Sequence, residues 1–567
     1  MFLYHLNLSF IPGGFLGVDI FFVISGFVIT TSLLHSSGSP LQRLKNFYLR
    51  RAKRILPASL TVVFLTAIGA LFLLPAYSRS RYSFEALASS LFSANLNFAR
   101  EGNDYLNQSL DPSPFLHYWS LGVEEQFYLL WPILFIFIFR KRRHLIVPTF
   151  IVSIAIAFAI TSANPVMGFY SPITRAWEFL AGIFFALHPI RFSRGRLVAF
   201  LGWFGMIGSI LAITVNSITP GWSTLIPVIS TALIIGSHRE FPRSAFLPWL
   251  GNYSFSLYLV HWPLIIFIPN KLMVVLVALP IAVLVTKSVE NPFRFNPQLQ
   301  FSLKQWGTGI AVVSILSYGV LAIPAQAKSS LDLSLPAVYN NGCHLSFNKT
   351  WPDHSCTFGD SAGKKLIYLV GDSHAAQWFP GLEAAAIKND WRLVSITKSS
   401  CPPVLIPILR NNKVDTSCEN WQKGVISSIR KNQPDVLLLS AFTEFQYQTT
   451  LKGSYEELWR QGMGDFLSQI GVPNIAFLGD TPKPPSNIPT CLSKSKHCDF
   501  PLTRTAATKV TQTVFGVNYI DTSSWFCSTL CNAMTDGINN YRDATHISVS
   551  ASLRMEHKLV QAINSLA

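Results

Sequence analysis

Charged residues are scarce throughout this chain, and cysteine is missing from its longer first part. Only 13% of the 567 residues are charged, whereas soluble globular proteins carry about 25%, so a compact cytosolic enzyme is a poor fit. Residues 1–328 hold 24 basic but only 10 acidic side chains, and residues 329–567 hold 21 and 19. All eight cysteines lie between Cys343 and Cys531. These contrasts predict two modules in different surroundings. The basic excess lies between hydrophobic segments, which argues against a nucleic-acid partner.

Long hydrophobic runs follow one another from the start of the chain. A helix of roughly 20 apolar residues crosses the hydrocarbon core of a bilayer. We predict about ten complete spans, near residues 15–34, 55–74, 119–139, 145–161, 169–187, 197–215, 223–236, 249–268, 272–289 and 306–323. The first part is therefore expected to be a polytopic α-helical membrane domain in contact with the lipid bilayer.

Basic residues gather in every second loop between these runs. The basic loops contain Arg43, Lys45, Arg50, Arg51, Lys53 and Arg54; residues 140–143; Arg191, Arg194 and Arg196; and Arg239 and Arg243. The other loops are nearly free of Lys and Arg or balanced by acids, as in residues 77–118. Because basic loops remain in the cytoplasm, the segment after residue 323 is predicted to lie outside it, where disulfides persist.

Several ionisable residues fall inside the predicted spans or, in the case of His5, in the short apolar stub before them. They are His5, Asp19, Glu124, Glu125, Arg175, Glu178 and His261. From their positions along the helices, the first four are expected roughly 6–9 Å below the outer ends of their spans. Burying such a group costs at least ~2.5 kcal/mol unless it faces a partner or a cavity. Structural ion pairs, such as Arg175 with Glu178, are one explanation. Convergence of the whole set at one depth favours a buried reaction chamber.

The first 300 residues also contain six motifs. They are GGFLGVDIFFVISGF (13–27), RRAKRILPA (50–58), HYWSLGVEEQFYLLWP (117–132), RAWEFLAG (175–182), YSFSLYLVHWPL (253–264) and VENPFR (289–294). In this order they resemble the membrane-bound acyltransferase-3 family, over essentially all of residues 1–300. The resemblance implies transfer of an acyl group, usually acetyl, from cytoplasmic acyl-CoA to a hydroxyl of an extracytoplasmic glycan.

The resemblance also implies residue roles. His5 matches the family's catalytic histidine, Arg51 and Arg54 match its Arg-x-x-Arg, and Glu124 matches the acid of its Ser-Leu-x-x-Glu motif. A neutral imidazole can take the proton of an attacking hydroxyl, and Asp19 or Glu124 is expected to orient it. Guanidinium groups pair with phosphates, so Arg51 and Arg54 are expected to bind acyl-CoA. Positive-inside topology alone would also explain a basic loop there.

The chain departs from the family before His5. Family members have a nearly complete helix there, with an arginine eleven positions upstream of the histidine, a position that would precede Met1. We expect either a start codon assigned too late or a real truncation that disables the membrane domain. The intact downstream motifs favour the first explanation.

The second part has the alternation of an α/β domain. A buried strand at 365–370 runs into Gly-Asp-Ser-His at 371–374, a helix is predicted at 375–389, and further strands are predicted at 435–439 and 474–478. A serine on a strand-to-helix turn is well placed as a nucleophile. Near the end of the chain, Asp543 and His546 are three residues apart, a spacing that lets acid and base reach one site.

GDSH followed by a C-terminal Asp-x-x-His resembles the SGNH hydrolase family over about residues 340–567, in the form fused behind acyltransferase-3 modules. The resemblance implies a triad of Ser373, Asp543 and His546 that acts on an ester or acyl group of a carbohydrate. The family's oxyanion asparagine is missing, since the chain reads Ser-Ala-Phe-Thr at 440–443. The Ser373 N–H is then expected to carry most of that stabilisation, and loss of one donor can cost ~10²-fold in rate. A fold relic that only binds sugar is the alternative.

Neighbouring cysteines are expected to pair. The predicted disulfides are Cys343–Cys356, Cys401–Cys418, Cys491–Cys498 and Cys527–Cys531, one of 105 possible connectivities. A metal site is the alternative, but the chain has no Cys-x-x-Cys pair, and we predict no metal. Lys304, an apolar stretch and Ala-Gln-Ala at 325–327 also mimic a signal peptide, although an internal helix is expected to stay uncut.

Together these observations predict a membrane domain at 1–300 with a truncated first family helix, a linking helix and linker at 301–340, and an extracytoplasmic α/β SGNH-like domain at 341–567. The predicted function is an O-acyltransferase of the bacterial inner membrane that acts on lipopolysaccharide O-antigen, peptidoglycan or exopolysaccharide. Acyl-CoA is expected as co-substrate, with no bound cofactor, and the outer domain in the periplasm or outside the cell. The alternatives are a polytopic transporter or flippase with an accessory carbohydrate esterase, and an inactive sugar-binding homologue.

Overall fold

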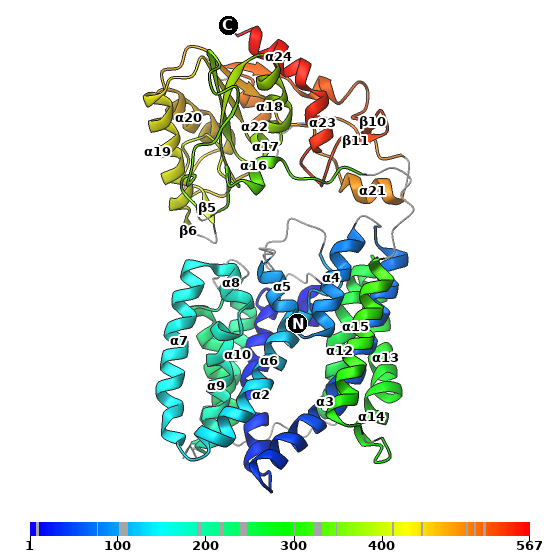
Figure 1. Ribbon diagram of the computed structural model, residues 1–567. Helices are drawn as coiled ribbons and strands as arrows, with labels where there is room; N and C mark the ends of the chain where they lie inside the picture. The colour runs from blue at the N-terminus through cyan, green and yellow to red at the C-terminus, as the bar shows by residue number, and fades with distance from the viewer. Residues whose placement is uncertain are drawn as a thin grey trace. The chain divides into compact units, whose positions relative to one another are not determined.

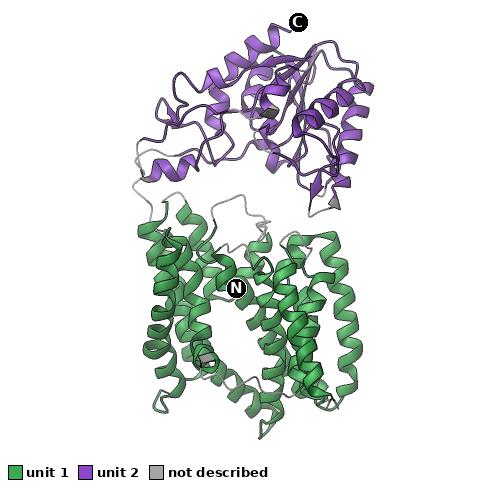
Figure 2. Ribbon diagram, turned by 180° about the vertical axis from the view of Figure 1, so that it is seen from behind, with its two compact units in different colours: residues 1–325 green, residues 326–567 purple. Residues whose placement is uncertain are grey.

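A computed structural model divides the chain into two compact units, residues 1–325 and 326–567, which Figure 2 shows in separate colours. It describes residues 1–6, 11–75, 78–100, 112–189, 192, 194–214, 219–237, 246–299, 301–322, 331–347, 349–410, 413–443, 446–494, 497–503, 506–513 and 517–566. Three predicted cytoplasmic arginines, Arg191, Arg239 and Arg243, and the signal-peptide-like residues 325–327 lie outside the described residues.

Unit 1 is made of helices (Figure 1). They are α1 (Phe2–His5), α2 (Gly17–Leu34), α3 (Pro40–Leu73), α4 (Arg79–Ser90), α5 (Ala94–Arg100), α6 (Tyr118–Leu134), α7 (Ile146–Ala163), α8 (Pro165–Tyr170), α9 (Pro172–Leu187), α10 (Gly195–Ala212), α11 (Trp222–Gly236), α12 (Phe246–Phe267), α13 (Lys271–Val285), α14 (Asn291–Phe295) and α15 (Leu303–Ala322). Each predicted span overlaps at least one of these helices, and the span predicted at 169–187 overlaps both α8 and α9. Within the described residues, seven helical segments are long and apolar enough to cross a membrane, as expected of a multi-pass membrane protein.

Helix α3 includes the basic segment that the sequence predicts as a loop. Its 34 residues begin with a capping box, in which Ser39 and Gln42 each accept a hydrogen bond from the other's backbone N–H, and with Pro40 in the first turn. At 1.5 Å per residue the helix is about 51 Å long, well beyond the roughly 30 Å hydrocarbon core. The basic residues from Arg43 to Arg54 therefore lie on a helix that starts outside the apolar stretch. The predicted loop at 77–118 likewise contains α4 and α5.

Helices α2 and α9 meet at two glycines from the family motifs. A Cβ on Gly26 would lie 2.1 Å from the carbonyl oxygen of Phe179, and one on Gly182 would lie 1.9 Å from that of Val23. Small residues at such a crossing let two helix backbones approach closely. The crossing aligns the two helices on which Asp19 and Arg175 lie.

Unit 2 is an α/β domain around a seven-stranded sheet. In spatial order the parallel strands are β1 (His344–Leu345), β4 (Trp391–Lys398), β3 (Lys365–Gly371), β7 (Val436–Ser440), β8 (Ile475–Leu478) and β9 (Asn518–Ile520), while β2 (Thr357–Gly359) pairs antiparallel with β4. Strands β3, β7 and β8 are the three that the sequence predicts. The predicted fold class of the second part is therefore confirmed.

Strand β3 is buried on both faces, as expected for the centre of a parallel sheet. Ile367 and Leu369 belong to a core shared with α18 (Phe379–Lys388), α23 (Val549–Arg554) and α24 (Glu556–Asn564). Tyr368 and Val370 belong to a second core with α19 (Thr416–Lys431) and α20 (Tyr455–Leu467).

The helix predicted at 375–389 is wrong as a single element. It is two helices, α17 (Ser373–Ala376) and α18, and the second begins with Pro380 in its first turn, where proline is favoured.

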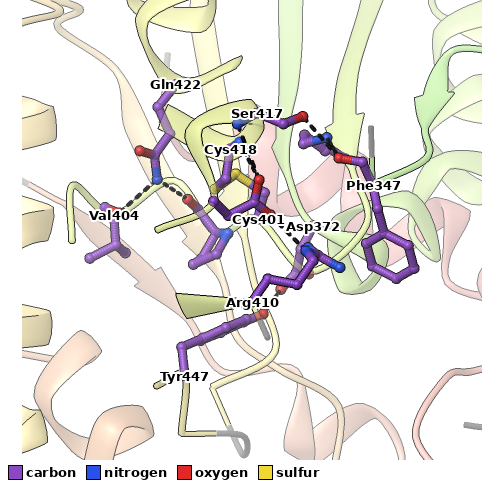
Figure 3. Close-up of a disulfide and its surroundings, with 12 residues drawn as sticks. Phe347, Asp372, Cys401, Val404, Arg410, Ser417, Cys418, Gln422 and Tyr447 are labelled. Atoms are coloured by element: carbon purple, nitrogen blue, oxygen red, sulfur yellow. Dashed lines mark hydrogen bonds and ion pairs between the residues drawn. A yellow bond between two sulfur atoms is a disulfide. The ribbon is translucent and has the colours of Figure 1, made fainter. Parts of the chain in front are cut away.

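All four predicted disulfides are present in unit 2: Cys343–Cys356, Cys401–Cys418, Cys491–Cys498 and Cys527–Cys531. The Cys401–Cys418 bridge joins the segment after β4 to the first turn of α19 (Figure 3). Beside it, Gln422 Nε2 donates to the carbonyl of Val404 at 2.8 Å. Covalent and hydrogen bonds therefore fix the segment after β4 against α19.

Candidate active sites

The turn at Ser373 depends on the glycine before it. Gly371 ends β3 with φ +154°, and a Cβ there would lie 1.8 Å from the carbonyl oxygen of Ser440 on the neighbouring strand β7. Only glycine readily adopts this positive φ and also has no Cβ to clash with the neighbouring strand. The chain then turns into α17, whose first residue is Ser373. The serine therefore stands at the carboxyl end of the central strand, where ligands bind in open α/β sheets.

Asp372 fixes this turn from both sides. Its Oδ1 accepts the backbone N–H of His374 at 2.8 Å and caps α17. Its Oδ2 accepts the N–H of Phe442 at 2.9 Å and the hydroxyl of Tyr447 at 2.8 Å. Figure 3 shows Tyr447 and Asp372 beside the Cys401–Cys418 bridge. The carboxylate thus joins the serine turn to the segment after β7.

Ser373, His546 and Asp543 form a hydrogen-bonded chain. His546 Nε2 lies 2.9 Å from Ser373 Oγ, and His546 Nδ1 lies 2.9 Å from Asp543 Oδ2. Asp543 Oδ1 also accepts the backbone N–H of His546 at 2.7 Å, which fixes the two side chains relative to each other. Because a carboxylate only accepts, the Nδ1 of neutral His546 carries the proton and Nε2 presents a lone pair to the serine. The three residues predicted from sequence are thus brought together in the geometry of nucleophile, base and orienting acid.

Burial and neighbouring charges together set the ionisation of the Ser373–His546–Asp543 triad. Burial lowers the pKa of His546 to about 4, against the opposing effect of Asp543 and with a further lowering by His374. Burial alone would raise the pKa of Asp543, but His546 and Arg542 hold it well below its usual range. Near neutral pH the acid is therefore ionised and the imidazole is neutral.

A second imidazole–carboxylate pair lies beside the first. His374 Nδ1 is 2.6 Å from Asp480 Oδ1, both side chains are 1% exposed, and the ring of His374 is 4.5 Å from that of His546. Sequence reasoning missed this pair, although His374 follows Ser373 directly. Asp480 follows β8 closely, and the carboxyl ends of parallel strands meet at one edge, so its position was a usable signal.

The segment after β7, where the sequence lacks the family's asparagine, carries an aromatic ring. Phe442, which follows β7, stacks on His374 with ring centroids 4.1 Å apart and planes 4° apart. A phenyl ring donates no hydrogen bond to an oxyanion. Ser373, as the first residue of α17, has a backbone N–H without an intrahelical partner. Its expected role in oxyanion binding stays a prediction.

In unit 1, Arg51 is bound by carboxylates. Its Nη2 lies 3.0 Å from Glu124 Oε1 and 3.3 Å from Glu125 Oε1, and its guanidinium lies 3.6 Å from the centre of the Tyr128 ring. The Tyr128 hydroxyl also donates to Glu124. Arg54 is exposed. Arg51 and Glu124, predicted for separate sites, are therefore direct partners, and Arg54 is the better placed of the two arginines for a phosphate.

Asp19 belongs to a different cluster. Arg175 Nη1 lies 2.8 Å from Asp19 Oδ1 and 3.0 Å from Glu178 Oε1, and all three side chains are at most 2% exposed. The Arg175–Glu178 ion pair that the sequence suggested as a structural explanation is therefore present. Both carboxylates expected to orient His5, Asp19 and Glu124, are bound by arginines, because a permanently charged guanidinium is a strong partner for a buried carboxylate.

His5 lies among other rings. Its ring centroid is 4.6 Å from that of Trp262 and 5.4 Å from that of His261, and His261 is 5.8 Å from His117. His261 Nδ1 is 2.6 Å from the carbonyl oxygen of Tyr258 and therefore carries a proton, which leaves Nε2 as the basic nitrogen. Sequence reasoning named His5 and His261 but did not use His117, although it begins a family motif.

One cluster in unit 2 has the residue types of a metal site. Among the described residues, Cys343, His354 and Cys356 offer ligand atoms within 4.8 Å of one another. The two sulfurs are joined in a disulfide, so no thiolate is available to a metal.

Models of two protein families match the chain. The family described as "Acyltransferase domain" matches residues 2–288, slightly more than half of the sequence. The chain belongs to the acyltransferase-3 family. The family described as "SGNH domain (fused to AT3 domains)" matches residues 342–561 of this acyltransferase-3 protein. Both family resemblances stated from the motifs are confirmed.

Named relatives match part of the chain. The peptidoglycan O-acetyltransferase OatA of Listeria monocytogenes is 30% identical over 296 residues, 46% of each protein. The O-acetyltransferase OatA of Staphylococcus aureus is 33% identical over 295 residues, 47% of this chain and 48% of that protein. The chain thus matches about half the length of these relatives. The solved periplasmic domain of a Salmonella ser. Paratyphi A lipopolysaccharide acetyltransferase covers 42% of this chain and 92% of its own at 19% identity, with a TM-score of 0.31, too low to support a conclusion.

Proposed function

We propose that this acyltransferase-3 protein is an O-acyltransferase that moves an acyl group from cytoplasmic acyl-CoA to hydroxyls of a cell-envelope or secreted polysaccharide. The observation that carries the proposal is the hydrogen-bonded Ser373–His546–Asp543 chain, in a unit joined to an acyltransferase-3 membrane unit. Peptidoglycan is the first acceptor to test and acetyl the first acyl group, because a relative is named a peptidoglycan O-acetyltransferase. The proposal assigns the chain to the bacterial inner membrane with unit 2 outside the cytoplasm, consistent with its four disulfides.

In unit 1 the proposed chemistry begins with acyl-CoA. The exposed guanidinium of Arg54 would pair with a phosphate of the donor. Arg51, already bound to Glu124 and Glu125, would position this segment of α3. His5 would take the proton of the hydroxyl that attacks the thioester carbonyl, and CoA would leave as the thiol once it regains a proton.

In unit 2 the proposed step is a relay. Ser373 Oγ attacks the carbonyl of the ester formed in unit 1 while its proton passes to His546 Nε2. The ester C–O bond breaks, and the alcohol that carried the acyl group leaves with that proton as an acyl-serine forms. A glycan hydroxyl then attacks the acyl-serine, its proton passes through His546, and Ser373 is regenerated. Asp543 stabilises the imidazolium in both steps without accepting the proton.

Membranes containing the full chain, supplied with radiolabelled acetyl-CoA and peptidoglycan, test the proposal. Label should enter the glycan with the unaltered protein and with the control Ser524→Ala, an exposed serine in unit 2. The relay predicts that Ser373→Ala abolishes labelling, whereas direct transfer predicts that it is retained. His5→Ala should abolish labelling by either route. Undiminished labelling by His5→Ala would contradict the role of His5. Labelling no higher than in membranes without the protein would contradict the acyltransferase and favour a transporter with an accessory esterase.

A further inference from the structure

The imidazole of His374 is held in the interior beside the base of the triad. Asp480 binds its Nδ1 at 2.6 Å, and Phe442 covers one ring face at 4.1 Å. The ring of His546 lies 4.5 Å away, tilted by 40°. No described residue bonds to His374 Nε2, although this atom is buried. An apolar residue would fill the same space without leaving a buried polar atom unpaired, so the imidazole calls for an explanation.

Its surroundings favour a positive charge. A carboxylate binds Nδ1 directly, and Asp372 accepts the backbone N–H of the same residue. The stacked ring of Phe442 presents its electron-rich face to the imidazole, which suits a cation. Burial alone would lower the pKa of His374, but Asp480, Asp372 and Asp543 outweigh burial and raise it.

We propose that His374 and Asp480 form a second imidazole–carboxylate dyad, whose positive charge keeps the neighbouring His546 in its neutral, proton-accepting form. The inference rests on the proposed roles of Ser373 and His546. In this assignment His374 is a positioning residue, because it acts through His546 and not on the acyl group. The titratable and charged groups facing the two imidazoles are Asp372, Asp480, Asp543, Arg542 and His344.

The physical effect is repulsion between like charges. Two cations at this separation in a buried site disfavour each other, so a charged His374 opposes protonation of His546. The base then remains neutral at acidic pH, and once it has taken the proton of Ser373 it returns that proton readily to the leaving group. Phe442, in the segment after β7, contacts the dyad through its stacking on His374.

The test follows p-nitrophenyl acetate hydrolysis by the detergent-solubilised full chain between about pH 3.5 and 8. The rate of Ser373→Ala is subtracted at each pH, so that only serine-dependent turnover remains. For the unaltered protein, kcat/KM should fall as the pH drops through about 4, the pKa of His546. This fall is the acid limb of the pH profile. In Asp480→Asn and in His374→Gln the limb should move up by about one pH unit. Asp480→Glu should restore it, and Asp415→Asn, a buried carboxylate at the start of α19, should leave it unchanged.

The outcomes distinguish failure of the proposed His374–Asp480 dyad from failure of the proposed role of Ser373. A limb that does not move, in a variant that keeps its activity at high pH, overturns the dyad. If neither variant folds, the unaltered protein still decides, because a limb at or above pH 6.5, the ordinary histidine value, overturns the proposal. Undiminished hydrolysis by Ser373→Ala instead overturns the proposed role of the serine, and with it the proposed function of unit 2.

Discussion

Arg51 and Arg54 stand three residues apart on α3 in different surroundings. Arg51 pairs with Glu124 and Glu125 and covers the ring of Tyr128, while Arg54 is exposed. Removal of one partner from a buried ion pair leaves the other charge uncompensated, which is far more costly than loss of an exposed charge. The two arginines of one motif therefore have separable roles.

Arg51→Ala should destabilise unit 1 by about 3–5 kcal/mol, because it leaves Glu124 buried without its cation. Thermal unfolding of the detergent-solubilised protein measures this as a lower Tm. Arg54→Ala is the matched variant, and it should keep the Tm while raising the KM for acyl-CoA. Equal Tm values for the two variants would contradict the assignment.

At this scale the sequence predicts the triad but not its neighbours. GDSH and Asp-x-x-His are local patterns, and each carries its own geometry. The pairs His374–Asp480 and Arg51–Glu124 join residues 106 and 73 positions apart. Such pairs depend on which strands and helices are adjacent in space, and a single sequence does not reveal that adjacency.

At the scale of helices, the α2–α9 crossing positions the Asp19–Arg175 ion pair. Gly26 and Gly182 face the opposite backbone so closely that no side chain fits between them. Backbone contact of this kind stabilises helix pairs in membranes through van der Waals packing.

Gly182→Val should force α9 away from α2 and cost at least about 1–3 kcal/mol. The measurement is Tm together with the fraction of protein that elutes as a single species in size-exclusion chromatography. Gly208→Val on α10 is the control, since nothing lies within 4 Å of a Cβ there. A comparable loss in both variants would show that a β-branched residue in the helix, and not the crossing, is responsible.

Hydropathy predicts the positions of these helices better than their ends. The start of α3 was missed because its first turns are basic and amphipathic, so hydropathy marks only the apolar remainder. The capping box at Ser39 and Gln42 was the available signal. The break between α17 and α18 was likewise signalled by Pro380.

At the scale of the whole chain, the disulfides distinguish the two units. All eight cysteines are paired within unit 2. Peptide mapping under non-reducing conditions should recover four cross-linked pairs and no free thiol. The double variant Cys401→Ser, Cys418→Ser should destabilise unit 2 by roughly 3 kcal/mol, as expected for a loop of this length. Urea unfolding monitored by tryptophan fluorescence measures the loss, and an unchanged midpoint would contradict it.

The four bridges join cysteines separated by only 13, 17, 7 and 4 residues. Each cysteine is bonded to its immediate neighbour in the order of the chain, and no loop encloses another. In the proposed export of unit 2, the first cysteine of each bridge would meet its partner before any later cysteine has emerged. We therefore expect oxidation during such export to yield the native connectivity directly, with an oxidant but without an isomerase to reshuffle mispaired bonds.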